Sequence, residues 1–292
     1  EPGLRSVVEE IRAAGGQAEF HLADAADPDA MTALAQRAVE LFGRIDTWVH
    51  VAAVSIWAEA EETTPEEYRQ VIEVNLLGQI HGALAALPYL KENGGALIAI
   101  SSIESRVGLP FQAAYAASKH GLVGFLDSLR LELKDQGSPV SVTNIMPASI
   151  DTPLFEKART RIGYQPKGVP PLYAPEDVAR AILYAAEHPV RDLMVGGVGR
   201  LLAGSQSLWP AATDELLLRT AIDGQYSDIR KTDAAPNNLF NSLPGNDRET
   251  GTGRHRSFSA YTWLATHPPV LYALAGAMAG MLLLGSRRSA AR

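Results

Sequence analysis

The amino-acid sequence predicts an α/β protein built on a doubly wound parallel sheet. From Gln17 to Val195, short runs of apolar and β-branched residues alternate with longer patterns of helical period. This alternation is typical of βαβ units with right-handed crossovers. The run Ala96–Ile100 is nearly all apolar, as expected of a strand that helices cover on both faces. A capping residue followed by proline, at Asp27–Pro28 and at Thr64–Pro65, marks helix starts between the strands.

Each element follows from a local pattern. We expect strands at Gln17–Ala23, Ile45–Val54, Ala96–Ile100, Val140–Ile145 and Leu193–Val195. We expect helices at Leu4–Ala13, Asp27–Phe42, Thr64–Leu90 and Gln112–Lys134, and a last one that begins at Pro175. Gly43 closes the helix that begins at Asp27, because glycine readily adopts the left-handed conformation found at helix ends.

The composition excludes several classes of function. The chain has 292 residues, with 26 Lys and Arg against 33 Asp and Glu, which gives a net charge of −7. This acidic balance argues against nucleic acid as a partner, because there is no basic excess to neutralise phosphates. The absence of cysteine excludes a disulfide framework, a thiolate metal site and a cysteine nucleophile, and we expect no metal. No secretory signal opens the chain, which favours the cytoplasm.

The character of the sequence changes after residue 222. We expect an α/β domain at 1–222, a linker at 223–267 and a hydrophobic helix at 268–285. The run Pro268–Gly285 holds no charged residue, and as a helix it would be about 27 Å long, close to the ~30 Å of a membrane core. Two interpretations stay open: a membrane anchor, which the preceding linker favours, or a terminal helix packed on the domain or on a second subunit.

Three side chains form the pattern most suggestive of chemistry. Ser102 lies just past the end of the buried strand, and Tyr115 and Lys119 lie four residues apart on the next helix, where they share a face. Ligands of open α/β sheets bind at the carboxyl ends of the strands. A free phenol has a pKa of ~10, and a neighbouring ammonium group lowers it. We therefore expect Tyr115 to exchange a proton with a carbonyl or alcohol oxygen that Ser102 holds.

With these motifs the sequence resembles the short-chain dehydrogenase/reductase family over most of residues 1–197. The resemblance implies a Rossmann-like fold, NADP or NAD as cofactor, and hydride transfer between that cofactor and a carbonyl/alcohol substrate. It also implies that Ser102, Tyr115 and Lys119 are catalytic. Asn75, in a sequence that matches the family pattern N-x-x-G, would be the fourth catalytic residue and help hold a water bonded to Lys119.

The same resemblance implies a set of cofactor-binding residues. These are Asp24, His50, Val51, Ala52, Tyr115, Lys119, Pro147, Ile150 and Thr152. Asp24 would contact the adenine ring, and the turn that begins at His50 would pass the ribose, although the family usually has N-N-A-G there. The segment from Pro147 to Thr152 resembles P-G-x-V-x-T, with Ala148 in place of the glycine, and would close over the nicotinamide and pyrophosphate.

The glycine-rich turn that holds the pyrophosphate in dinucleotide folds would lie upstream of Glu1. We therefore expect a sheet that lacks its first strand and a chain that is an N-terminally truncated record of a complete enzyme. Two other functions remain as alternatives: an epimerase or dehydratase of the extended branch, and a membrane-tethered nucleotide-binding protein without catalysis. We also expect a homo-oligomer, and a substrate lid between Thr152 and Tyr173 whose apolar residues suit a bulky or lipophilic substrate.

Overall fold

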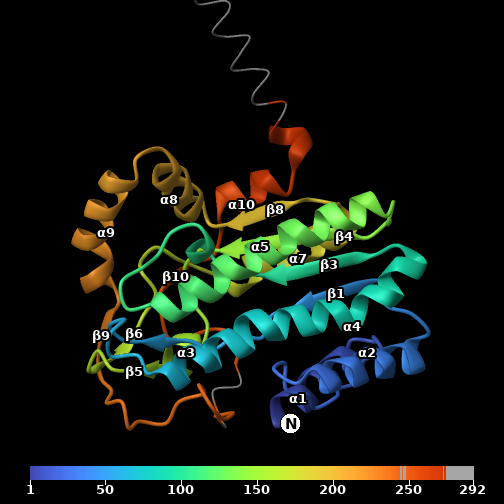
Figure 1. The fold of residues 1–292 in the computed structure, drawn as a ribbon, viewed down its shortest axis with the longest axis horizontal. Coiled ribbons are helices and arrows are strands. Elements are labelled where there is room, and N and C mark those ends of the chain that lie inside the picture. Colours follow the sequence, from blue (N-terminus) through green and yellow to red (C-terminus); the bar gives the residue numbers. More distant parts are fainter. Residues whose placement is uncertain (244, 246–247, 272, 274–292) are drawn as a thin grey trace, which may run out of the picture.

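A four-stranded parallel sheet forms the centre of the computed structural model, which describes residues 1–243, 245, 248–271 and 273. The strands are β1 (Thr47–His50), β3 (Ala96–Ile100), β4 (Ser141–Pro147) and β8 (Asp192–Val195), in the order β1-β3-β4-β8. All three pairings are parallel, and Trp48 lies beside Leu97, which lies beside Val142. The predicted α/β class and parallel sheet are confirmed (Figure 1).

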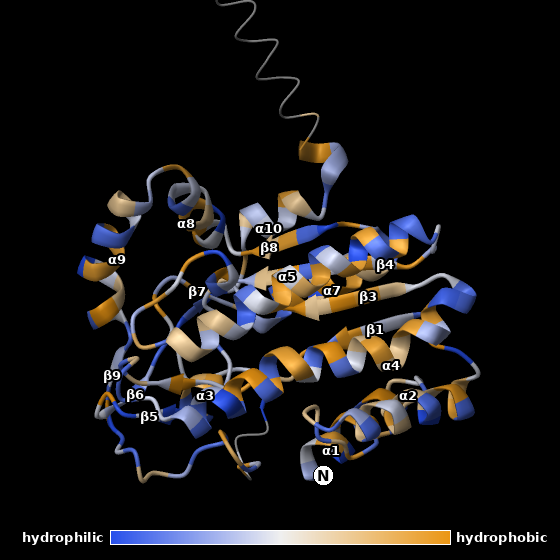
Figure 2. Ribbon diagram, viewed as in Figure 1, coloured by the Kyte–Doolittle hydropathy of each residue, from blue (hydrophilic) through white to orange (hydrophobic). Residues whose placement is uncertain are grey.

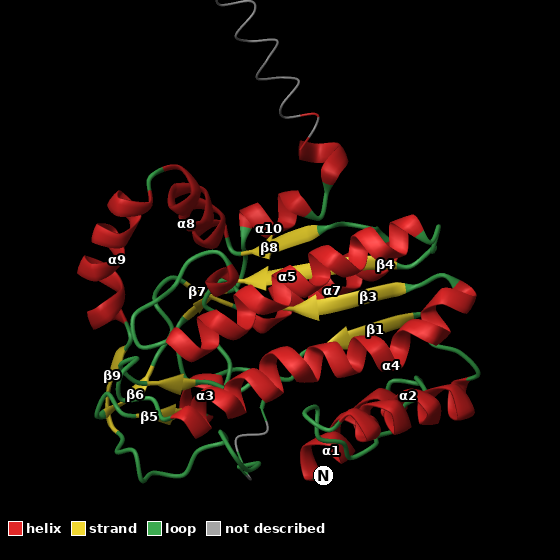
Figure 3. Ribbon diagram, in the orientation of Figure 1, coloured by secondary structure: helices red, strands yellow, loops and turns green. Residues whose placement is uncertain are grey.

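Helices cover both faces of this sheet. On one face lie α4 (Gly78–Asn93) and α5 (Ala113–Asp135), with α2 (Pro28–Phe42) packed outside α4 and α1 (Pro2–Ala13) beyond it (Figure 3). On the other face lies α7 (Pro175–Glu187).

Strand β3 shows why both faces need a cover. Leu97 and Ala99 belong to the core cluster under α4 and α5, whereas Ala96, Ile98 and Ile100 belong to the cluster under α7. All five residues are buried, and side chains of a strand alternate between its two faces. Figure 2 shows the resulting hydrophobic strand in the middle of the molecule.

The capping residues fix the helix starts as the sequence predicts. The Asp27 carboxylate accepts hydrogen bonds from the backbone N–H groups of Asp29 and Ala30 at the start of α2, and Gly43 ends this helix with φ of 83°. At the start of α3 (Pro65–Ile72), Thr64 and Glu67 form a reciprocal capping box. Helix α3 continues into α4 through the π-helical turn η1 (Glu73–Leu77).

The predicted strand Gln17–Ala23 does not form. This segment is irregular and largely exposed in the structure. A strand requires a neighbour for its backbone N–H and C=O groups, and none of the described residues pairs with this segment. Among the described residues, β1 likewise pairs on one side only, with β3.

Residues 197–267 fold back along the end of the sheet where the strands finish. They form α8 (Gly197–Leu208), α9 (Pro210–Gly224), β9 (Tyr226–Arg230), β10 (His255–Arg256) and α10 (Ala260–Ala265). β9 pairs with β6 (Tyr164–Pro166), and β10 pairs with β7 (Leu172–Tyr173). A further short pair joins β2 (Ile56–Trp57) to β5 (Arg159–Thr160), which follows α6 (Leu154–Lys157).

The stretch 223–267, interpreted from its composition as a linker, contacts the domain at several points. Leu239 is 1% exposed and packs in the core cluster beside β2, and the Thr262 hydroxyl accepts a hydrogen bond from the Gly196 backbone N–H. The Asp151 carboxylate accepts hydrogen bonds from Gly253 and His255.

The expected hydrophobic helix Pro268–Gly285 lies outside the described residues, apart from 268–271 and 273. Within the described part of the chain, one helical run, Pro65–Asn93, is long and apolar enough to cross a membrane by length and composition alone. That run consists of α3, η1 and α4, which pack against α2, α5 and the sheet.

Helix α4 approaches β1 closely at Gly82. A Cβ atom at this position would lie 2.5 Å from Nδ1 of His50 and 3.0 Å from Nε1 of Trp48. The imidazole of His50 is therefore enclosed between strand and helix and is 7% exposed. Burial, with smaller effects of Lys119 and His81, lowers the pKa of His50 from 6.5 to about 4.

We predict that Gly82→Ala lowers the free energy of unfolding by about 1–3 kcal/mol, because the added methyl group forces the helix away from β1. Gly124→Ala in α5 is the matched control, since a Cβ there meets nothing within 4 Å. It should leave stability unchanged or raise it by up to ~1 kcal/mol. Urea unfolding measures both, and equal midpoints for the two variants would disprove the close contact.

Burial of the His50 imidazole makes the stability of the fold depend on pH. His50 binds a proton less readily in the folded state, so the unfolded chain takes up more protons between pH 4 and 6.5. The contribution of neutral His50 to the free energy of unfolding is complete above pH 6.5. It declines by about 3 kcal/mol as the pH falls towards 4.

The difference in unfolding free energy between wild type and His50→Asn should therefore shrink as the pH is lowered through this window. His120→Asn is the control, because His120 lies exposed on α5. Urea titrations at a series of pH values test this, and a difference that does not change with pH would show that His50 titrates normally.

Candidate active site

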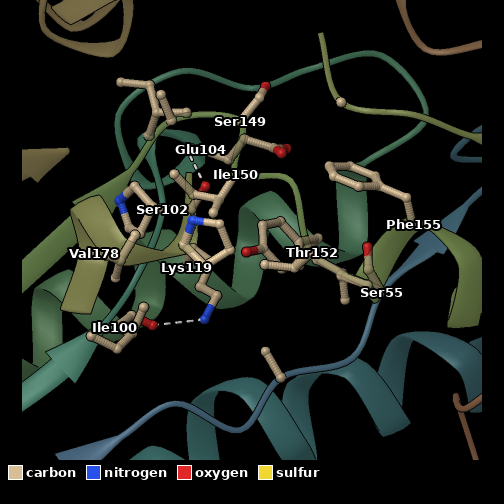
Figure 4. A pocket seen from close by; sticks show the side chains of 18 of the residues that line it. Ser55, Ile100, Ser102, Glu104, Lys119, Ser149, Ile150, Thr152, Phe155 and Val178 are labelled. Atoms are coloured by element: carbon tan, nitrogen blue, oxygen red, sulfur yellow. Dashed lines mark hydrogen bonds between the residues drawn. The ribbon is translucent and has the colours of Figure 1, made fainter. Parts of the chain in front are cut away.

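A cavity of about 600 Å³ lies where β1, β3 and β4 end. Ser102, Tyr115 and Lys119 all line it, so the structure brings together the three side chains that the sequence pattern selects. Ligands of open parallel sheets bind at this edge. Figure 4 shows Ser102 and Lys119 on adjoining walls of the cavity.

Ser102 is placed by the end of β3 and by the short 3₁₀ turn η2 (Ile103–Ser105). Its backbone is extended, with φ of −167° and ψ of 165°, and its hydroxyl oxygen accepts a hydrogen bond of 3.1 Å from the backbone N–H of Glu104. The Ser105 hydroxyl donates to the carbonyl oxygen of Ser102 at 2.7 Å. The hydroxyl of Ser102 is thus held at the strand end, where a substrate oxygen can reach it.

Lys119 enters the cavity floor from α5. Its side chain is 1% exposed, and Nζ donates a hydrogen bond of 2.9 Å to the carbonyl oxygen of Ile100, the last residue of β3 (Figure 4). Nζ also lies 5.4 Å from the ring centroid of Tyr115, one helical turn earlier. Burial lowers the pKa of Lys119 to about 8, although the nearby Glu104 carboxyl opposes this effect.

The phenol of Tyr115 differs from the sequence expectation. Burial of its hydroxyl and the nearby Glu104 carboxyl raise the pKa of Tyr115 above 10, and a hydrogen bond with Ser102 opposes them. The expected lowering by Lys119 is not found, because the ammonium group bonds to Ile100 and lies against the ring. In this state Tyr115 is a protonated donor.

Asn75 does not line the cavity but supports it from behind. It is fully buried in the π-helical turn η1, the kind of local irregularity often found at functional sites. Its side chain exchanges two hydrogen bonds with the backbone of Val54, of 2.8 and 2.9 Å, and donates to the Ser118 hydroxyl at 3.3 Å. Asn75 therefore connects the segment after β1 to helix α5.

The cofactor-binding residues expected from the resemblance are divided by the structure. Those that line the cavity, besides Tyr115 and Lys119, are Val51, Pro147, Ile150 and Thr152. Those that do not line it are Asp24, His50 and Ala52.

Asp24 and His50 have surroundings outside the cavity, whereas Ala148 lines it. Asp24 is exposed and accepts a hydrogen bond from the Ala26 backbone in a turn. His50 packs against α4 at Gly82, because alternate side chains of β1 point to opposite faces. Ala148, which replaces a glycine of the family pattern, has no positive φ and so needs no glycine.

The backbone of Ile150 faces away from the strand beside it. Tyr173 donates to the carbonyl oxygen of Ser149 at 2.9 Å and accepts from the backbone N–H of Asp151 at 3.0 Å. In a parallel bridge of this kind the N–H and C=O of the intervening residue point the other way. This bridge therefore does not use the backbone donor and acceptor of Ile150, a residue that lines the cavity.

Two buried amides near the site were missed in the sequence. Gln79 donates to the carbonyl oxygens of His50 and Ile100, at 3.2 and 3.3 Å, and so joins the ends of β1 and β3. Gln112 accepts a hydrogen bond of 2.9 Å from the Ser55 hydroxyl. Gln79 lies four residues after Asn75, and Gln112 lies three residues before Tyr115. This spacing is the sequence signal that could have identified both amides.

Much of the remaining cavity wall is apolar. Trp57, Leu109, Leu154, Phe155 and Val169 line it. The indole N–H of Trp57 donates to Gln225 at 2.9 Å, and its ring lies 5.6 Å from that of Phe155. In the described part of the chain, no group of three or more His, Asp or Glu residues is arranged to hold a metal ion.

Comparisons with known proteins identify the family. The model of the short chain dehydrogenase family matches residues 1–163. The chain is 35% identical over 277 residues to an uncharacterised oxidoreductase, YxnA, of Bacillus subtilis, covering 94% of this chain and 78% of that protein. It is 32% identical over 218 residues to 3beta-hydroxysteroid dehydrogenase 1 of Eggerthella lenta, covering 72% of this chain and 82% of that one.

A solved structure has the same fold. It is an alcohol dehydrogenase from the archaeon Thermococcus sibiricus, complexed with 5-hydroxy-NADP. The two chains superpose with a TM-score of 0.57 at 23% identity, over 65% of this chain and 80% of the other. The family model and the relatives identify the same family as the residues at the strand ends. The chain therefore belongs to the short-chain dehydrogenase/reductase family and is an NAD(P)-dependent oxidoreductase that acts on small molecules.

Proposed function

We propose that the protein transfers a hydride between NADP or NAD and a carbonyl/alcohol substrate, with Tyr115 as the acid and base. The observation that carries this proposal is the convergence of Ser102, Tyr115 and Lys119 on one cavity at the strand ends. In the reducing direction, the Tyr115 hydroxyl gives its proton to the carbonyl oxygen as that oxygen gains charge, and the alcohol forms. In the oxidising direction, the same oxygen takes the proton back.

Ser102 and Lys119 assist this proton transfer in different ways. The Ser102 hydroxyl donates a hydrogen bond to the substrate oxygen and holds it within reach of Tyr115. Lys119 holds its ammonium group 5.4 Å from the ring centroid, and it would have to turn from the carbonyl oxygen of Ile100 towards the phenolate to stabilise that charge. NAD(P), when bound, supplies or accepts the hydride, which no side chain can do.

The residues at the cavity fit the nicotinamide end of such a cofactor. Lys119 and Tyr115 offer donors for ribose hydroxyls, and the outward-facing backbone of Ile150 suits the donor and acceptor of a carboxamide. The Thr152 hydroxyl and the wall at Val51 and Pro147 complete this side. We propose that these six residues, Lys119, Tyr115, Ile150, Thr152, Val51 and Pro147, bind the cofactor. His50, Ala52 and Asp24 would not contact the nicotinamide.

Asn75 is proposed as a positioning residue. Its side chain is occupied with Val54 and Ser118, so its contribution to a proton relay would come through a water held between η1 and Lys119. The π-helical turn supports this assignment, because an inserted residue leaves a backbone carbonyl without its helical donor.

The apolar wall supports a bulky, lipophilic substrate. Trp57, Leu109 and Phe155 come from three separate segments and converge on the cavity beyond Ser102. Ligand sites of this type are lined mainly by apolar and aromatic side chains, with a few polar groups that set orientation. A secondary alcohol or ketone attached to a ring or a long chain fits this arrangement.

Two features of assembly and location are proposals as well. Leu84 on α4 and Leu131 on α5 are 56% and 69% exposed, which supports a homo-oligomer that covers these helices. The uncharged run Pro268–Gly285 supports contact of a cytoplasmic enzyme with a membrane through its C-terminus. After lysis without detergent, this enzyme should sediment with membranes, and a protein found only in the supernatant would refute that contact.

We predict that Tyr115→Phe lowers NAD(P)-linked turnover by about a hundredfold or more, because the acid and base is lost. Quenching of protein fluorescence by NADPH should change little, since the phenyl ring keeps its place. Tyr89→Phe, which removes a hydroxyl outside the cavity, is the matched control and should keep full activity. Turnover by Tyr115→Phe at the wild-type rate would refute the assigned role.

A further inference from the structure

Glu104 is a buried acid that the proposed reaction does not use. It lines the cavity two residues after Ser102 and is 8% exposed. Its backbone N–H donates to the Ser102 hydroxyl oxygen, so the two side chains share one wall of the cavity (Figure 4). Its carboxyl oxygen Oε2 is buried and has no hydrogen-bond partner among the described residues.

An unpartnered carboxyl oxygen at such a place is costly. Buried polar groups are nearly always paired, and one left without a partner costs about 1–3 kcal/mol. Glu67 pairs with Arg159 and Arg161, and Asp177 pairs with Arg180 through one of its two oxygens, whereas no described side chain forms a hydrogen bond with the carboxyl group of Glu104. Because Glu104 lines the cavity, a ligand that binds there is the candidate partner of its carboxyl group.

Among the described residues, no cation forms a hydrogen bond or an ion pair with Glu104. Lys119, the cation that acts on it, gives its hydrogen bond to Ile100, and Tyr115 bonds to Ser102. The other basic side chains of the cavity lining are Lys157, Lys167 and Arg248, which come from other segments. Burial raises the pKa of Glu104 to about 8 despite Lys119, so the environment lacks enough positive charge to keep it ionised.

We propose that Glu104 determines specificity by accepting a hydrogen bond from a second polar group of the substrate, a hydroxyl or a protonated amine beside the reacting carbon. This rests on the proposed function, because Ser102 and Tyr115 define where the reacting oxygen lies. The substrate class is then a diol, hydroxyketone or amino alcohol on a lipophilic frame, since the opposite wall is apolar.

The two donors differ in their pH dependence. A protonated amine requires the ionised carboxylate, so its binding strengthens as the pH rises towards 8, where Glu104 loses its proton. A hydroxyl donates to either form of the carboxyl group, so its binding changes little over the same range.

Three probes with the same ring test the proposal: cyclohexanol, trans-1,2-cyclohexanediol and trans-2-aminocyclohexanol. Binding is measured by the fluorescence of Trp57, which lines the cavity, with Trp57→Phe used to identify the signal. We expect the wild type to bind the diol or the amino alcohol about tenfold or more tightly than cyclohexanol. Glu104→Leu should reduce that ratio to about one, and Glu104→Gln should keep a preference for the diol only.

The outcomes separate the two proposals. Binding does not require turnover, so Tyr115→Phe should keep the preference for the second polar group even when it is inactive. Glu104→Leu should also raise the urea midpoint, because it removes an unpartnered buried acid. A wild-type ratio near one, an unchanged ratio in Glu104→Leu, or a lowered urea midpoint in that variant would each overturn the role of Glu104.

Discussion

Lys119 carries its ammonium group into the interior, where it donates a hydrogen bond to the carbonyl oxygen of Ile100 at the end of β3. This bond fixes α5 against the strand end, and so places Tyr115, one helical turn earlier, beside the cavity. A buried cation is costly without partners, and the drop in the pKa of Lys119 to about 8 reflects that cost. Gln79 donates to the same carbonyl oxygen, which leaves Ile100 as the shared acceptor beneath the site.

Burial of this group of side chains also explains their protonation. The cavity lowers the pKa of Lys119 and raises those of Glu104 and Tyr115, because each change favours the uncharged form in surroundings of low polarity. Tyr115 in this state is suited to giving a proton to a carbonyl oxygen. Acting as a base in the proposed reaction would require additional positive charge near its oxygen, which an oxidised nicotinamide would supply when bound. In our proposal, the apolar wall and the carboxyl group of Glu104 select the substrates that are held beside it.

The sequence predicted the four strands of the sheet and the helix starts, because apolar runs and capping residues are local signals. It also placed Ser102, Tyr115 and Lys119 together, since spacing on a strand and a helix determines their common edge. It was wrong at Gln17–Ala23, because a strand depends on a neighbour that local pattern does not reveal. The direction of His50 and the burial of Glu104 were not predictable, since they depend on how α4 and η2 pack against the strands.

The central claim is that burial keeps Tyr115 protonated and that the positive charge of bound NADP⁺ would lower its pKa. Carbon-13 NMR of the ring carbon bonded to oxygen measures this directly, with the resonance of Tyr115 assigned by its loss in Tyr115→Phe. We predict a pKa above 10 for Tyr115 in the protein alone and a lower pKa after addition of NADP⁺. A pKa at or below 10 without cofactor, or one that the cofactor leaves unchanged, would contradict the claim.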